Sequence, residues 1–216
     1  MIALITQREI KTYNKKSDQL EESYISYFEK KGINLVPIPN NTNNFDFYLG
    51  LHPSLIILSG GGDIDPQKLC IKKQNFPCRE LIERNLLDYA SKNKTPVLGI
   101  CRGMQAINYY FGGELIKLDD PESHVAKDHY VYFTDHFGRK LGKKAKVNSF
   151  HNYGITKKDL SKSLEAIAST EQGVIEAVYH PNLPILGLEW HPERLSPDDK
   201  INDLIIDSFL AGGLFK

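Results

Sequence analysis

A single cysteine stands where a buried strand is predicted to turn into a helix. Residues 96–100 form the short apolar run that is typical of a strand buried on both faces, and apolar residues at helical spacing follow the cysteine. Cys101 is flanked by Gly99 and Gly103 in the pattern G-x-C-x-G. Small neighbours permit the strained turn that presents a nucleophile, and a helix N-terminus lowers the pKa of a thiol. We predict that Cys101 is a nucleophile; the alternative is a buried structural cysteine.

A thiol that attacks a carbonyl needs a base, which the segment His191-Pro192-Glu193 can supply. This segment follows the apolar run 185–190, which predicts a strand. Proline favours extended backbone around it, where side chains two residues apart face the same side. His191 can then transfer protons while Glu193 orients its ring. The alternative is a surface turn with incidental charge, because the tripeptide alone is a weak signal.

Acyl transfer also requires hydrogen-bond donors for the oxygen that becomes negative. The backbone N–H of Arg102, next to the nucleophile, is one candidate. The glycine loop 60–62 can provide another, because no side chain screens its peptide groups. This loop could instead bind a phosphate. It lacks the Lys-Ser/Thr of a P-loop and the spacing of a dinucleotide fingerprint, so we favour the oxyanion role.

The elements that must position these groups alternate between strand and helix. Strands are expected at residues 2–6, 33–38, 55–58 and 96–100, with a loop over 40–44. Helices are expected after Ser17, as an N-cap, up to Gly32, and over Glu80–Asn93. This order predicts an α/β fold: a mostly parallel, doubly wound sheet with helices on both faces, and functional loops at the carboxyl ends of its strands.

After Gly113 the pattern changes, and short strands predict an antiparallel extension of the sheet. These strands are expected at residues 130–133, 145–150, 166–169, 174–179 and 185–190, and a turn at 181–182 joins the last two. A helix over 201–210 closes the chain. With 216 residues, 41% of them hydrophobic, the sequence can bury one sizeable core, and we expect a single domain over 1–216.

Composition excludes several classes of protein. Lys plus Arg and Asp plus Glu both number 27, so no net basic field indicates a nucleic acid or an anionic membrane as partner. The three cysteines cannot form a disulfide framework, and Cys70 and Cys78 lack the histidine spacing of a zinc site. The N-terminus has no signal-peptide pattern, and no apolar run is long enough to span a membrane. We expect a cytoplasmic protein.

Together these motifs resemble the class I glutamine amidotransferase-like superfamily, in particular its free-standing γ-glutamyl hydrolase branch. The resemblance rests on LIILSGGGDIDP, PVLGICRGMQAIN, GGEL, VNSFHNYGI and GLEWHPE, in this order along nearly the whole chain. It implies Cys101 as nucleophile, His191 as base and acid, Glu193 as orienting carboxylate, and Gly61 and Arg102 as main-chain oxyanion donors. It also implies that Gln105, His151, Asn152 and Tyr153 surround the glutamyl group.

Several further residues could belong to the site, and each of them also has a plainer explanation. Gln105 lies one helical turn beyond Cys101 and so on the same face, although it could be an ordinary surface amide. The γ-glutamyl hydrolase branch often has two adjacent histidines where this chain has His151-Asn152, which leaves the contacts of that segment open. Arg8 could reach an anionic part of a substrate or simply be solvated. The histidines at 124, 129 and 136 fit no common metal-ligand spacing and are expected in loops.

Two functions from different classes remain. The first is a stand-alone hydrolase that cleaves a γ-glutamyl amide; overall likeness, and no residue spacing, suggests γ-glutamyl-CDP-amidate from capsule phosphoramidate synthesis. The second is a glutaminase component that delivers ammonia to a synthase partner. A binding module without activity would leave the cysteine corner and His-Pro-Glu unexplained. We expect no cofactor, no metal and, for the hydrolase, no required partner protein.

Overall fold

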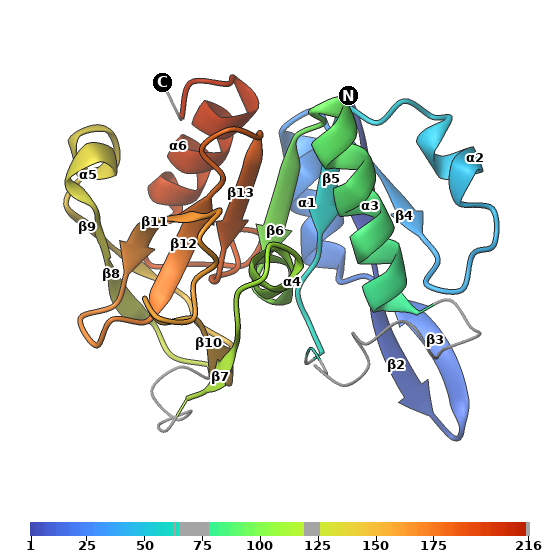
Figure 1. The fold of residues 1–216 in the computed structure, drawn as a ribbon, viewed down its shortest axis with the longest axis horizontal. Helices are drawn as coiled ribbons and strands as arrows, with labels where there is room; N and C mark the ends of the chain where they lie inside the picture. The colour runs from blue at the N-terminus through green and yellow to red at the C-terminus, as the bar shows by residue number, and fades with distance from the viewer. Residues whose placement is uncertain (63, 65–77, 119–125, 215–216) are drawn as a thin grey trace.

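The computed structural model describes residues 1–62, 64, 78–118 and 126–214, and its centre is a nine-stranded sheet (Figure 1). Five strands are parallel, in the spatial order β4 (Asn34–Ile38), β1 (Ile2–Thr6), β5 (Leu55–Leu58), β6 (Val97–Ile100) and β13 (Ile185–Leu188). Antiparallel strands continue it: β12 (Ile175–Tyr179), β11 (Glu165–Ser169), β8 (His129–Phe133) and β9 (Lys144–Val147). The predicted α/β fold and its antiparallel extension are confirmed.

Helices cover both faces of the sheet because successive strand residues point to opposite sides. One face packs against α1 (Glu22–Lys30), α5 (Asp135–Leu141) and α6 (Asp199–Leu210). The other packs against α3 (Arg79–Asn93) and α4 (Arg102–Tyr110). In β5, Leu55 and Ile57 belong to the first layer, and Ile56 and Leu58 to the second. No helix among the described residues is both long and apolar enough to cross a membrane.

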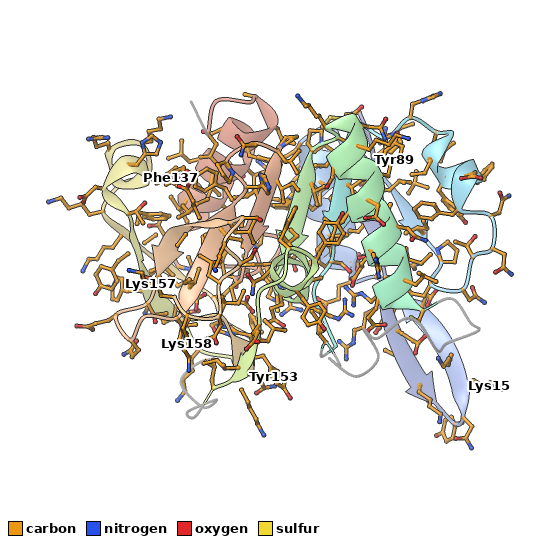
Figure 2. The ribbon with its side chains drawn as sticks, viewed as in Figure 1. Lys15, Tyr89, Phe137, Tyr153, Lys157 and Lys158 are labelled. Carbon is orange, nitrogen blue, oxygen red and sulfur yellow. The ribbon has the colours of Figure 1, made fainter. Side chains whose placement is uncertain are left out.

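The expected N-cap at Ser17 is wrong, because the chain first forms a hairpin. Strands β2 (Arg8–Thr12) and β3 (Lys15–Gln19) pair antiparallel across Tyr13 and Asn14, whose φ angles are 49° and 60°. Two successive left-handed residues make the tight turn that joins twisted strands. Ser17 lies in β3, and the helix begins only at Glu22. Figure 2 shows Lys15 at the outer end of this hairpin.

Smaller differences concern the ends and the connections of elements. The structure adds helix α2 (Phe45–Leu49) after the expected loop, helix α5 between the two predicted strands, and a short pair of β7 (Ile116–Lys117) with β10 (Tyr153–Gly154). The strand expected to reach Phe150 ends at Val147, and the one expected to reach Trp190 ends at Leu188. Each early end leaves the following residues free to turn toward the edge of the sheet where the parallel strands finish.

Helix α4 lies so close to the sheet that only glycine fits at two positions. A β-carbon on Gly103 would overlap the carbonyl oxygen of Leu58, the last residue of β5. One on Gly99 would come within 2.5 Å of the Ile107 Cδ1 atom and 2.7 Å of the Gly103 carbonyl. The two glycines that flank the cysteine are therefore required by the packing of the helix against β5 and β6.

A glycine-to-alanine substitution in α4 and one in α5 test this packing. Alanine is the better helix former by about 0.5–1 kcal/mol, so Gly138→Ala in α5, where a β-carbon meets no atom within 3.8 Å, should not destabilise. Gly103→Ala should lower the free energy of unfolding by about 1–3 kcal/mol, because the added carbon displaces backbone of β5. Urea denaturation of both variants measures the difference, and equal stabilities would contradict the packing argument.

Candidate active site

The predicted site residues come together at the edge of the sheet where the parallel strands end. A cavity of about 270 Å³ is lined by segments that directly follow β5, β6 and β13. All ten predicted site residues line it except Glu193, which contacts the cavity-lining His191 from behind. The residues that line the cavity are Arg8, Gly61, Gly62, Cys101, Arg102, Gln105, Phe150, His151, Asn152, Tyr153, His191 and Arg194.

Cys101 occupies a strained corner between β6 and α4. Its φ is 50° and its ψ is −109°, a backbone conformation that costs a non-glycine residue on the order of 1–3 kcal/mol. The corner is held by two backbone hydrogen bonds: the Cys101 N–H donates to the Leu188 carbonyl at 2.7 Å, and its carbonyl accepts from Gln105 at 3.1 Å. The predicted strand-to-helix elbow is therefore present, and it is tied to β13 as well as to α4.

The expected low pKa of this thiol is wrong. Burial raises the pKa of Cys101 far above its ordinary value, and the neighbouring carboxylates of Glu189 and Glu193 raise it further. The backbone N–H of Arg102 lowers that pKa, but this effect of the helix start is the smaller one. A raised pKa favours the thiol form of Cys101, which would need a base to remove its proton if it acts as a nucleophile.

His191 is placed to be that base. Its Nδ1 lies 2.6 Å from a carboxylate oxygen of Glu193, and both side chains are buried. A β-carbon placed on Gly60 would lie 2.7 Å from the His191 Cε1 atom and 3.5 Å from the Cys101 Cβ atom. The imidazole ring and the cysteine side chain therefore lie on the same side of Gly60. The pair does not arise from extended backbone as expected: the Arg194 N–H donates to the His191 carbonyl, and the segment is a turn.

The glycine loop after β5 presents two peptide N–H groups near the nucleophile. The first two amides of the loop are used internally, because Ser59 donates to the Thr6 hydroxyl at 3.0 Å and Gly60 to the Tyr24 hydroxyl at 2.8 Å. Gly61 and Gly62 have φ angles of 81° and 79° and line the cavity. Within the described part of the chain, their N–H groups donate to no partner.

Gln105 and the segment 151–153 form the inner wall of the cavity. The Gln105 side-chain amide donates to Glu189 at 2.6 Å, and it lies 3.4 Å from the Tyr153 carbonyl. His151 Nδ1 lies 2.8 Å from the same carbonyl. Gln105 is buried, so the reading of it as an ordinary surface amide is wrong.

Two buried glutamates behind this wall were not singled out from the sequence. Burial raises the pKa of Glu189 to about 8, although His151 opposes the shift. Glu176 keeps a pKa of about 2 against its burial, because His151 and His129 lie beside it. Burial lowers the pKa of His151, but Glu189 and Glu176 bring it to about 9. These shifts favour the charged form of His151, the ionised form of Glu176 and the protonated form of Glu189. The sequence marks these glutamates only by their positions: Glu176 lies inside an apolar strand, and Glu189 directly follows one.

Arginine side chains stand at the rim of the cavity. Arg8, at the start of β2, is exposed and passes so close to Gly61 that a β-carbon there would lie 2.7 Å from its Cδ. Arg194, which the sequence analysis did not single out, pairs with Glu21 at 2.7 Å and lies 4.6 Å from the centre of the Phe150 ring. Phe150 in turn packs edge-on against His191, with ring centres 5.6 Å apart.

The remaining histidines do not form a metal centre in the described residues. His129 lies in β8 with its Nε2 3.3 Å from Glu176, and His136 lies in α5 against Phe137, so the expectation that both are in loops is wrong. His124 and Cys70 lie outside the described residues. Across the described ranges, no group of three or more His, Cys, Asp or Glu side chains is placed to hold a metal ion.

Comparisons with known proteins place the chain among relatives of one family and one fold. The Peptidase C26 family profile matches residues 1–193. The chain is 34% identical to gamma-glutamyl-CDP-amidate hydrolase of Campylobacter jejuni, over 88% of each chain. It is 30% identical to the glutamine amidotransferase-like protein YvdE of Lactococcus lactis, over 91% of this chain and 90% of that one. Among solved structures, a glutamine amidotransferase from Thermotoga maritima superposes with a TM-score of 0.67, at 15% identity, over 100% of this chain and 98% of that one.

The two buried glutamates should respond to substitution in opposite directions. The pKa of Glu189 is higher in the folded protein than its ordinary 4.5, so this carboxyl destabilises the fold increasingly as pH rises from about 4.5 to about 8. Glu189→Gln should match the wild type near pH 4.5 and gain in free energy of unfolding by up to about 1.4 kcal/mol per pH unit until pH 8. Glu176, whose pKa is lowered, stabilises the fold above about pH 4.5 and loses this effect as pH falls toward 2.

Glu176→Gln is therefore the matched control, with a lower stability than the wild type at neutral pH. Urea denaturation between pH 4.5 and 9 measures both variants. A Glu189→Gln protein that is no more stable than the wild type at pH 8 would contradict the assignment of a neutral Glu189.

Proposed function

Because this chain belongs to the Peptidase C26 family, in the class I glutamine amidotransferase-like group, we propose that it hydrolyses a γ-glutamyl amide through a thioester on Cys101. The products are L-glutamate and the amine that was attached to the γ-carbonyl. The observation that carries this proposal is the meeting of Cys101, the His191–Glu193 pair and two available glycine N–H groups around one cavity. That set provides a nucleophile, a base and oxyanion donors, which acyl transfer requires.

In the first half-reaction, His191 removes the thiol proton as Sγ bonds to the γ-carbon. The carbonyl oxygen becomes negative and accepts hydrogen bonds from the N–H groups of Arg102 and Gly61. When the intermediate collapses, the C–N bond breaks, and His191 returns its proton to the leaving amine. A γ-glutamyl thioester remains on Cys101. Because the pKa of the thiol is raised, proton removal has to accompany the attack.

In the second half-reaction, His191 activates a water molecule that attacks the thioester carbonyl. The C–S bond breaks, glutamate leaves, and Cys101 recovers its proton. Glu193 accepts the hydrogen bond from Nδ1 throughout, so Nε2 is the nitrogen that exchanges protons, and the carboxylate stabilises the imidazolium. Its role is orientation, not proton transfer.

The substrate lies across the cavity with its glutamyl end at the inner wall. Gln105, His151, Asn152 and Tyr153 surround that end in the proposed complex. The amine side leaves at the rim, where Arg8 is exposed and suits an anionic leaving group. The name of the Campylobacter jejuni relative supports γ-glutamyl-CDP-amidate, a diphosphate, as substrate, which would make capsule modification the setting and the cytoplasm the site of action.

The alternative is a glutaminase component that passes ammonia to a synthase. The similarity to a glutamine amidotransferase-like protein of Lactococcus lactis favours it. The two functions differ in the leaving group: ammonia in one, a larger amine in the other. They also differ in whether a partner protein must complete the oxyanion hole.

The purified protein alone should therefore cleave a γ-glutamyl amide with a leaving group larger than ammonia, and prefer it to glutamine. In the proposed hydrolase the oxyanion donors need no partner protein to position them, whereas a missing donor would cost on the order of a hundredfold to a thousandfold in rate. The measurement is kcat/KM for glutamate release from a panel of γ-glutamyl amides and from glutamine. Inert larger amides, with glutamine hydrolysis that rises only when a second protein is added, would favour the amidotransferase.

Substitutions in the proposed triad should form a graded series. Cys101→Ala should abolish turnover and leave the fold intact. His191→Ala should lower kcat by about 10²–10⁴-fold, the usual worth of general acid–base catalysis. Glu193→Gln should lower it less, because the amide oxygen can still accept from Nδ1. Circular dichroism checks the fold of each variant. Equal losses for the last two variants, or labelling by an electrophilic glutamine analogue at Cys78 in place of Cys101, would contradict the assigned roles.

A further inference from the structure

Resting on the proposed function, we infer that Arg79 and Tyr24 are positioning residues that hold the glycine loop from opposite sides, so that the Gly61 N–H faces the nucleophile before substrate arrives. Neither residue lines the cavity, and neither contacts the place where substrate would bind. Both act through the backbone of residues 59–61. Among the described residues, Arg79 is the buried cation with the most hydrogen bonds, and this role explains them.

Arg79 uses all five of its N–H donors within the protein. Nη2 donates to the Ser59 carbonyl and, at 3.1 Å, to the Ser59 hydroxyl. Nη1 donates to the carbonyls of Gly60 at 3.2 Å and Gly61 at 2.6 Å. Nε donates to Glu83 at 2.8 Å. Three successive carbonyls of the loop thus converge on one guanidinium, which is 4% exposed.

These contacts fix the direction of the peptide groups. In a trans peptide the C=O and the following N–H point in opposite directions, and no described peptide bond is cis. Because the Gly60 carbonyl points at Arg79, the Gly61 N–H must point away from it. The Gly61 carbonyl directs the Gly62 N–H away from Arg79 in the same manner. Both donors therefore face the side opposite the guanidinium.

Tyr24 holds the same loop at its remaining amide. Its hydroxyl, buried under α1, accepts from the Gly60 N–H at 2.8 Å. This bond occupies the Gly60 N–H, and it prevents the Ser59–Gly60 peptide from flipping. A peptide held at its N–H by a tyrosine and at its neighbouring carbonyls by an arginine has one orientation.

Glu83 joins this clamp to the second proposed donor. Its carboxylate accepts from Arg79 and also from Arg102 Nη1, at 2.6 Å to each oxygen. Arg102 further donates to Glu80 at 2.9 Å. The side chains of Arg79 and Arg102 are both buried, so one carboxylate fixes the two segments whose backbone N–H groups would hold the oxyanion. The two donors belong to segments about forty residues apart in sequence, the glycine loop and the start of α4, and Glu83 sets their relative position.

Two conservative variants test the clamp. Arg79→Lys keeps the charge but cannot reach three carbonyls and Glu83 together, and should lower kcat for a γ-glutamyl anilide by about 10–100-fold, as expected for a displaced oxyanion donor. Tyr24→Phe removes a single hydrogen bond, worth about 0.5–1.5 kcal/mol, and should lower kcat by roughly 2- to 13-fold. KM should change little for either variant, because the ground-state contacts of the glutamyl group are untouched.

Alkylation of Cys101 by iodoacetamide distinguishes loss of an oxyanion donor from a general loosening of the site. A general loosening would change the alkylation rate, whereas loss of an oxyanion donor would not. In this reaction Sγ displaces iodide and the thiol proton goes to His191, and no oxyanion forms. Cys101 should be alkylated at the wild-type rate in both variants. Mass spectrometry of the peptide that contains Cys101 measures this rate. Arg84→Lys, from the exposed face of α3, and Tyr27→Phe, from α1, are the matched controls and should match the wild type in kcat.

Each outcome decides the matter. Unchanged kcat in Tyr24→Phe, or alkylation that falls in parallel with kcat, overturns the clamp. Tyr24→Phe, which keeps every buried charge, carries the test alone if Arg79→Lys does not fold. If the wild-type protein is alkylated at Cys101 but cleaves neither γ-glutamyl anilide nor glutamine, the proposed function is contradicted. The clamp, which rests on that function, then fails as well.

Discussion

The close approach of Gly103 to the carbonyl of Leu58 is the constraint on which the site depends. Because no β-carbon intervenes, the first turn of α4 lies directly against the end of β5. The residue after Leu58 begins the glycine loop, and the residue two before Gly103 is the cysteine. One backbone contact therefore fixes the distance between Cys101 and the loop proposed to stabilise the oxyanion that forms when the thiol attacks. A β-carbon at position 103 would push the first turn of α4 away from the end of β5.

Around this contact, charge is buried in two separate groups. On the side of α3, Arg79, Glu83 and Arg102 form a network of both signs, and removal of one member would leave an uncompensated charge. On the side of β12, the cationic His151 and Glu176 compensate each other, and Glu189 stays neutral next to the thiol. Cys101 lies close to these groups, but the main cause of its raised pKa is burial, with Glu189 and Glu193 adding to it.

The parts of the site that could be predicted from sequence are those with a local cause. The corner at Cys101, the glycine loop and the His191–Glu193 pair each occupy a few consecutive residues at the end of a strand, so topology alone brings them together. The clamp by Arg79 could not be predicted, because an arginine at a helix start gives no local sign of the carbonyls it will meet. The hairpin was missed because Tyr13 and Asn14 adopt left-handed backbone without a glycine.

The position of β13 has a consequence for how the protein matures. His191 and Glu193 directly follow this strand, yet it pairs with β6, which was completed more than eighty residues earlier in the chain. A growing polypeptide therefore exposes its cysteine for a long interval without a base and without the hydrogen bond from Cys101 to Leu188. Under the proposed function, the thiol gains its base only when the last parallel strand docks against β6. Catalytic competence would then come late in folding, after the chain through β13 has been synthesised.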